Sequence, residues 1–264
     1  MRTELGKLAG IFIIAAALLT ACEKQPKITT TDDGLVIEEL VAGTGAEAQM
    51  NSSVTVHYTG WLYDDSAEES KGEKFDSSLD RDAKFSFVLG QGRVIKGWEQ
   101  GVTGMQVGGQ RRLTIPPDLA YGSRGAGKVI PPDATLVFDI ELFDVDTLEI
   151  IDQVVGDGPE AVKGAKVAVD YTGWLYDESA AEQKGTRFDS SLDRGNKFRF
   201  VLGAGQVIPG WDLGVAGMKV GGKRTLIIPA ALAYGKRGSG KSIPPDSRLL
   251  FDVELFEVDT AALK

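Results

Sequence analysis

A seven-residue string, FDSSLDR, occurs twice in this chain, starting at positions 75 and 188, which are 113 residues apart. Other landmarks keep the same offset without a gap, from Ile37 and Ile150 onward to Val145 and Val258. A repeated unit of about 110 residues has the size of one ordinary domain. A solenoid would need more and shorter repeats. The chain is therefore predicted to fold as two tandem domains, joined near residues 144–149.

The repeat divides the chain into four predicted segments. Residues 1–21 are predicted to be a signal peptide, and residues 22–33 a lipid-attachment cysteine followed by a flexible tether. The first domain is expected over residues 34–146 and the second over residues 147–264.

Residues 1–21 have the pattern of a secretory signal. Arg2 and Lys7 precede an apolar run, Leu8–Leu19, that is too short to span a membrane comfortably. The string LTAC follows and ends at Cys22, the only cysteine, which has no partner for an internal disulfide. LTAC resembles a bacterial lipobox, whose cysteine is lipidated; the alternative is a plain cleaved signal with an incidental cysteine. Because Glu23 is not the aspartate that often retains lipoproteins in the inner membrane, we expect an exported chain anchored by its N-terminal lipid in a bacterial envelope. Its expected location is the outer membrane, facing the periplasm.

Charge argues against one class of partner. The chain has 29 basic and 38 acidic residues, a formal net charge of −9. A nucleic-acid-binding protein needs a basic face, so nucleic acid is not an expected partner.

Period-two alternation dominates each repeat. Residues 54–58, 85–89, 113–115 and 136–142 alternate between apolar and polar, which predicts strands. Residues 94–105 instead carry apolar side chains at intervals of four, four and three, a helical stripe that includes Trp98, and residues 207–218 repeat it. The predicted fold class is therefore α+β: each domain is a curved antiparallel sheet, a half-barrel, wrapped on one short helix with its tryptophan inward.

The sequence argues against ATP binding, a Ser-His-Asp triad and a bound cofactor. The string GKRGSGKS at residues 235–242 matches the phosphate-loop pattern, but two prolines follow directly, where ATP binding needs a helix. His57 is the only histidine and has Asp170 at its repeated position, so a shared Ser-His-Asp triad is excluded. With no Cys/His cluster, neither zinc nor another cofactor is expected.

Both repeats share a set of aromatic residues, and an aspartate follows one of the phenylalanines in each. The motifs YTG, FDSS, VIKGWEQGV, AYG and VIPPDATLVFDIEL resemble the FK506-binding protein (FKBP) family of peptidyl-prolyl cis-trans isomerases, and the resemblance covers both repeats nearly end to end. It implies a pocket between helix and sheet in each domain. The implied catalytic residues are Tyr58, Asp76, Tyr121, Tyr171, Asp189 and Tyr234. The implied substrate-binding residues are Phe75, Arg81, Phe85, Val94, Ile95, Trp98, Ile130, Phe138, Phe188, Arg194, Phe198, Val207, Ile208, Trp211, Ile243 and Phe251.

The resemblance also implies a function. The expected activity is rotation of X-Pro bonds in exported or envelope proteins, with proline-containing polypeptides as substrates and macrolides of the tacrolimus and rapamycin type as inhibitors. The alternative is a lipid-anchored chaperone or adaptor that holds proline-containing segments without turnover.

Two departures from the family pattern stand out. Charged insertions at residues 64–74 and 177–187 precede FDSS; we interpret them as solvated hairpins, the alternative being partner-binding flaps. Ser242 replaces Val129 on the expected pocket rim, which predicts a slower second domain.

Overall fold

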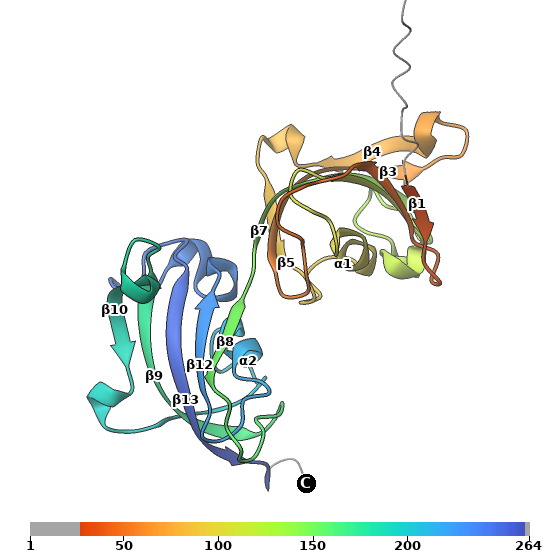
Figure 1. Cartoon of the computed structure of the whole chain (residues 1–264). Coiled ribbons are helices and arrows are strands. Elements are labelled where there is room, and N and C mark those ends of the chain that lie inside the picture. Colours follow the sequence, from red (N-terminus) through yellow and green to blue (C-terminus); the bar gives the residue numbers. More distant parts are fainter. Residues whose placement is uncertain (1–26, 262–264) are drawn as a thin grey trace, which may run out of the picture.

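The computed structural model of the chain describes residues 27–261. Two curved antiparallel sheets follow one another along the chain, and each holds one short helix against its concave face (Figure 1). The predicted α+β class, with two half-barrels and one helix each, is confirmed. Within residues 27–261, no helix has the length and apolar character needed to cross a membrane.

The first sheet has the strand order β1-β2-β6-β7-β3-β4, with β5 paired to β3. Its strands are β1 (Lys27–Thr30), β2 (Val36–Val41), β3 (Ser53–Tyr63), β4 (Lys71–Ser77), β5 (Phe85–Val88), β6 (Gln110–Ile115) and β7 (Leu136–Asp146). Its helix is α1 (Lys96–Val102), and four 3-10 turns cover Glu68–Ser70, Leu79–Arg81, Pro117–Leu119 and Gly122–Arg124.

The second sheet repeats this plan in the order β10-β9-β13-β12-β8, with β11 paired to β9. Its strands are β8 (Glu149–Val154), β9 (Lys166–Tyr176), β10 (Lys184–Ser190), β11 (Phe198–Val201), β12 (Lys223–Ile228) and β13 (Leu249–Asp259). Its helix is α2 (Pro209–Gly214), and its 3-10 turns cover Ala181–Gln183, Leu192–Arg194, Ala230–Leu232 and Gly235–Arg237.

Each predicted alternating run falls on a strand, and only Leu89 lies beyond the end of its strand, β5. In β3, Val54, Val56 and Tyr58 are buried against the core, while the residues between them face outward and are half-buried. This is the alternation expected of a sheet with one packed face. The central pairing of β3 with β7 joins Tyr58 to Ile140 and Gly60 to Phe138, which sets these side chains beside each other on the concave face.

The helices are shorter than the apolar stripes predict. The stripe at residues 94–105 is helical only over Lys96–Val102, yet Met105 beyond it remains fully buried. The chain turns at Gly104, whose φ of 78° is left-handed and suits glycine. The inward face was predicted correctly, because burial continues through the turn, while the helix itself ends earlier.

The predicted flexible tether is wrong for its last seven residues. Lys27–Thr30 forms β1, which pairs antiparallel with β2, with Ile28 opposite Glu38. A turn follows, in which the Thr31 hydroxyl donates to Asp33 at 2.5 Å. The run ITT has high strand propensity, and an open sheet edge at β2 gives it a partner. Residues 1–26, with the predicted signal and Cys22, lie outside the described residues.

The charged insertions fold back on the sheet rather than standing away from it. In the first, Lys71 lies 2.6 Å from Glu69 and 2.7 Å from Asp139 of β7. In the second, Lys184 makes the equivalent contacts with Glu182 and Asp252, at 2.6 and 2.8 Å. In each insertion a lysine therefore links the insertion to the outer face of its sheet.

Gly60 in β3 lies directly under two rings. A Cβ atom there would come within 2.6 Å of Phe138 and 2.7 Å of Phe75, and Gly173 has the same relation to Phe251 and Phe188. We expect Gly60→Ala to lower the free energy of unfolding by roughly 1–3 kcal/mol, because an extra methyl overpacks the aromatic cluster. Urea denaturation measures this.

The control combines Gly60→Ala with Phe75→Leu. Since a smaller side chain makes room for the methyl, the double variant should lose less stability than the two single variants predict by addition. Additive losses would contradict the steric explanation.

Candidate functional site

The floor of the candidate site in the first domain is the ring of Trp98, which α1 directs onto the sheet. Trp98 is 4 % exposed. Its ring centroid lies 5.0 Å from that of Tyr58 and 5.3 Å from that of Phe138, both close to perpendicular. Phe85 and Phe87 stack on each other beside it. Edge-to-face packing of this kind is favourable beyond the area it buries, so the cluster forms a rigid apolar floor.

The polar side of the site is a network of Tyr58, Asp76 and Arg81. The Tyr58 hydroxyl donates to Asp76 Oδ2 at 2.5 Å, and Arg81 donates to Asp76 Oδ1 at 2.5 Å. Arg81 also donates to the Tyr58 oxygen at 2.9 Å. The carboxylate is therefore held by two donors, and its orientation toward the aromatic cluster is fixed.

A bulge explains how two consecutive residues, Phe75 and Asp76, both serve this site. Successive residues of a strand face opposite sides. In β4 the pairing passes from Trp61 with Lys74 to Gly60 with Asp76, so Phe75 is an extra residue without a partner on β3. The Phe75 ring reaches Phe138 at 5.5 Å while Asp76 reaches Tyr58. The second domain has the same register shift in β10 at Phe188.

The two serines after Asp76 hold the backbone of β3 at the site. The Ser77 hydroxyl donates to the Tyr58 carbonyl at 3.1 Å, and the Tyr58 N–H donates to Ser78 Oγ at 2.9 Å. Both serines are buried. Buried hydroxyls need partners, and these are satisfied by fixing Tyr58, so all four letters of FDSS have a structural role.

Charge states follow from this geometry. Burial alone would raise the pKa of Asp76, but hydrogen bonds from Tyr58 and Arg81 outweigh it and hold the pKa of that carboxyl below its ordinary value. Burial and the bond to Asp76 raise the pKa of Tyr58. In the second domain, burial followed by the bond to Asp189 raises the pKa of Tyr171 to about 12. At neutral pH the aspartates are ionised and the tyrosines are protonated donors.

The second domain reproduces the site and encloses a hollow of about 160 Å³. Trp211 lies 4.9 Å from Tyr171 and 5.3 Å from Phe251 between ring centroids. Tyr171 donates to Asp189, and Arg194 donates to Asp189 at 2.5 Å and to the Tyr171 oxygen at 2.8 Å. The hollow is lined by Tyr171, Phe188, Asp189, Phe198, Gln206, Val207, Ile208, Trp211, Tyr234 and Phe251.

Not every residue implied by the resemblance lines this hollow. Ile243 is 7 % exposed and packs in the core, and Ile130 does the same in the first domain. Arg194 acts from outside through Asp189. Gln206 was missed, because it stands where the first repeat has Arg93 and no shared pattern marks it. The binding and catalytic roles themselves remain predictions.

Tyr121 and Tyr234 lie at the edges of the two sites. They are 41 % and 40 % exposed. Burial of the ring, together with the nearby charge of Asp76, raises the pKa of Tyr121, and Asp189 acts in the same way on Tyr234. Val94 and Ile95 pack against the first cluster from the start of α1. Each hydroxyl therefore stands at a site mouth in its protonated form.

The predicted contrast between Val129 and Ser242 is wrong in its premise. Both residues are exposed, and Ser242 does not line the second hollow. Asp170, which replaces His57, faces the outer side of its sheet, where it accepts from Ser191 and Lys197. His57 likewise reaches outward to Ser78 at 2.8 Å. These substitutions give no reason for a slower second domain.

Across residues 27–261, no three His, Cys, Asp or Glu side chains gather in the way a metal ion requires.

Comparison with known proteins gives the same picture for both repeats. The family described as FKBP-type peptidyl-prolyl cis-trans isomerase matches residues 45–143 and 158–256. Peptidyl-prolyl cis-trans isomerase FKBP10 from Homo sapiens is 42 % identical over 218 residues, which cover 80 % of this chain and 35 % of that protein. The FK506-binding protein of Neisseria meningitidis serogroup B is 54 % identical over 112 residues, 42 % of this chain and 96 % of that protein.

Solved structures are similar over parts of the chain. FkpA from Escherichia coli is 41 % identical with a TM-score of 0.41, over 48 % of this chain and 54 % of that one. This chain spans about a third of the length of the first curated relatives it matches.

The Tyr58–Asp76 hydrogen bond can be tested by titrating Asp76, with Asp189 of the unaltered second domain as the internal control. Tyr58→Phe removes a hydrogen bond that lowers the pKa of Asp76, so that pKa should rise while the lowered pKa of Asp189 stays unchanged. Carbon-13 NMR of the carboxyl groups measures both.

The sign for stability follows from linkage. A depressed carboxyl pKa stabilises the fold above about pH 4, and this stabilisation is lost as pH falls through the pKa of the folded state. Tyr58→Phe should therefore raise the pH at which the protein unfolds in acid. An unchanged Asp76 titration would contradict the network.

Proposed function

The chain belongs to the family of FKBP-type peptidyl-prolyl cis-trans isomerases, and from this premise we propose that each of its two domains catalyses rotation about X-Pro bonds of polypeptides. The observation that carries the proposal is the pairing, in both domains, of a tryptophan floor with a fixed aspartate at its edge. The two sites have matching geometry, so both are proposed to act.

The chemistry requires little from the protein. Rotation about an X-Pro bond breaks amide resonance, against a barrier of roughly 18–20 kcal/mol, and no covalent bond is made or cleaved. A nucleophile, metal or cofactor is therefore unnecessary. The proline ring enters the apolar hollow over Trp211 or Trp98, where water is excluded and the planar, more polar amide loses part of its solvation advantage.

The polar groups at the edge orient the substrate. Asp76 is ionised and already holds two donors, so its part is to fix Tyr58 and to set the field at the site mouth rather than to transfer a proton. The Ile95 N–H, at the start of α1, orients a substrate carbonyl. Tyr121 stands at the mouth with its hydroxyl protonated and available to donate to the peptide.

Variants of the full chain in which only one of the two sites is altered test this function. Asp76→Ala with Phe85→Ala alters the first site, and Asp189→Ala with Phe198→Ala alters the second; both phenylalanines lie at the edges of their clusters rather than in the deep core. Each pair should lower kcat/KM on an X-Pro peptide to about half, and the fourfold variant should lose about tenfold or more. A protease-coupled assay measures the rates.

Macrolides give the matched inhibition measurement. Tacrolimus carries a ring that mimics proline, so the wild type should bind two equivalents and each single-site variant one. Binding of proline-containing peptides by a chain without isomerase activity would replace the enzyme proposal with the holding function.

We further propose that the chain is exported and anchored by lipid on Cys22, in the outer membrane of a bacterial envelope and facing the periplasm. Its substrates there are folding envelope proteins. The support is the sequence alone: a charged start, an apolar run, the string LTAC and Glu23 after the cysteine. Two or three acyl chains on one residue anchor stably, whereas one does not.

Cys22→Ser tests the anchor. The variant should leave the membrane fraction, because the thiol that accepts the lipid is gone, and it should take up no labelled palmitate. Cys22→Ala is the second variant, with the same expectation. A wild type without label, or a serine variant that remains with membranes, would overturn the lipoprotein assignment.

A further inference from the structure

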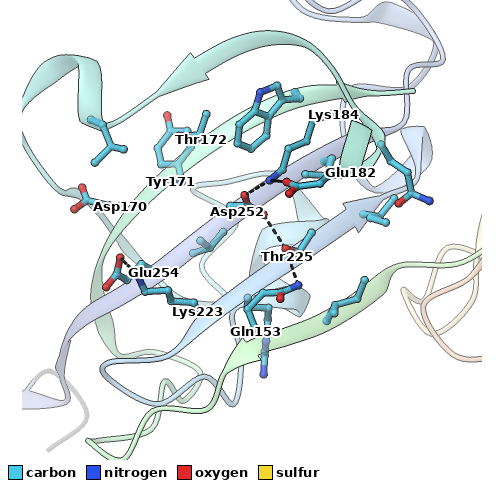
Figure 2. A pocket seen from close by; sticks show the side chains of 18 residues that line it. Gln153, Asp170, Tyr171, Thr172, Glu182, Lys184, Lys223, Thr225, Asp252 and Glu254 are labelled. Carbon is cyan, nitrogen blue, oxygen red and sulfur yellow. Dashed lines mark hydrogen bonds and ion pairs between the residues drawn. The ribbon is translucent and has the colours of Figure 1, made fainter. Parts of the chain in front are cut away.

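A second hollow lies on the outer face of the second sheet, away from the aromatic site (Figure 2). Its volume is about 690 Å³, against about 160 Å³ for the aromatic hollow. Apolar side chains of Ile151, Trp174, Ile227 and Leu250 line part of it, and charged and polar groups of β9, β12, β13 and the charged insertion line the rest. We refer to it as the outer groove.

The first domain fills the equivalent position with an arginine. Arg112 on β6 donates from Nε to Asp139 at 2.7 Å and from Nη2 to the other oxygen of Asp139 at 3.1 Å. Nη2 also donates to Glu69 of the insertion at 3.0 Å. The side chain of Arg112 is only 11 % exposed. A planar guanidinium thus bridges strand β7 and the insertion in the fork geometry that suits two carboxylates.

The second domain keeps the carboxylates and lacks the guanidinium. Position 225, which repeats position 112, is threonine, while Asp252 and Glu182 repeat Asp139 and Glu69. Thr225 donates to Asp252 at 2.7 Å, and Lys184 contacts both carboxylates, as Lys71 does in the first domain (Figure 2). Two carboxylates therefore share one cation where the first domain supplies two.

Exposure shows the consequence of the missing side chain. The side chain of Asp252 is 41 % exposed against 29 % for Asp139, and that of Glu182 is 75 % exposed against 50 % for Glu69. Glu38, which stands 3.9 Å from Arg112, is replaced by Ile151, so the floor of the outer groove becomes apolar at that point. The other charged pair on its rim, Lys223 with Glu254, is self-balanced at 3.3 Å.

We infer that the outer groove binds an arginine side chain presented by a segment of another polypeptide. The guanidinium takes the place that Arg112 occupies in the first domain, between Asp252 and Glu182. Arginine suits the site better than lysine, because the point charge of Lys184 is already present and a planar fork matches two separated carboxylates. Apolar residues next to the arginine in the bound segment cover Ile151, which is 43 % exposed, since the groove is larger than one side chain.

The experiment titrates the full chain with acetyl-Leu-Arg-Leu-amide, by calorimetry and by NMR shifts of Thr225 and Asp252. The peptide has no proline, so it is no isomerase substrate, and the outcome is independent of the proposed activity. Matched peptides replace arginine with lysine or with uncharged, isosteric citrulline. We expect one site, weakened at least about tenfold for either replacement.

The variants exchange the residues at the equivalent positions 112 and 225 between the two domains. Thr225→Arg should fill the groove and abolish binding, and Arg112→Thr should open a second site. Asp252→Asn is the second variant, which keeps the test valid if Thr225→Arg fails to fold. It keeps the shape of the side chain but removes the charge, so it should also weaken binding of the peptide. Asp189→Ala in the aromatic site should leave the affinity for this peptide unchanged, because Asp189 does not line the outer groove.

Several results would overturn the inference. They are no binding, equal affinity for the arginine, lysine and citrulline peptides, or binding that persists in both Thr225→Arg and Asp252→Asn. Concentration-dependent dimerisation that Thr225→Arg removes, without peptide binding, would show instead that the groove is a contact between copies of this chain.

Discussion

The packing of one indole ring between a short helix and a concave sheet is the interaction on which each domain depends. Helix α1 lies so close to the sheet that its glycines, Gly97 and Gly101, rest directly on Ile115 and Leu113, with no room for a methyl group. This closeness lowers Trp98 into the hollow of the sheet, where four other rings surround it. Edge-to-face packing of these rings is favourable beyond the area it buries, so the packing of the helix and the apolar floor of the site depend on the same indole ring. The candidate site is thus the exposed edge of the hydrophobic core rather than a feature added to it.

Sequence reasoning gave the parts of this arrangement that depend on local periodicity. Alternation located β3, β5, β6 and β7, the helical stripe located Trp98 on the inner face, and the repeat indicated two domains of the same plan. It missed what depends on pairing partners. The bulge at Phe75 cannot be recognised from the sequence of β4 alone, because a bulge is defined by the pairing of β4 with β3. The pairing of Lys27–Thr30 was missed for the same reason, since a short polar strand needs an open edge to be recognised. Ser242 was misplaced because the loop's direction, set by the bridge of Ser239 with Ile243, turns it to solvent.

The two repeats also provide an internal comparison of what a domain needs with what it tolerates. On the concave faces, ring distances agree within a few tenths of an ångström, and the Tyr–Asp–Arg networks use the same atoms. On the convex faces the polar contacts differ: His57 bonds to Ser78 where Asp170 bonds to Ser191 and Lys197. The ring packing of the concave face is thus repeated while these convex contacts vary, which indicates that the two faces carry separate requirements.

Adjacent residues on β6 and β12 make this separation explicit. Both domains have an arginine at the first of these positions, Arg111 in one and Arg224 in the other. Each points to the helix side and donates to carbonyls at the end of its helix. Arg111 donates to Gly101 at 3.0 Å, and Arg224 donates to Gly214 at 2.7 Å. Those carbonyls have no partner within the helix, and a cation there is favourable. The next residue along, Arg112 or Thr225, points to the opposite side and differs between the domains. Because the side-chain period of a strand is two, a single step along the chain passes from a position that the helix requires to one that it does not contact. The outer face of the second domain could therefore lose its arginine, and open a groove, without disturbing the helix that holds the tryptophan in place.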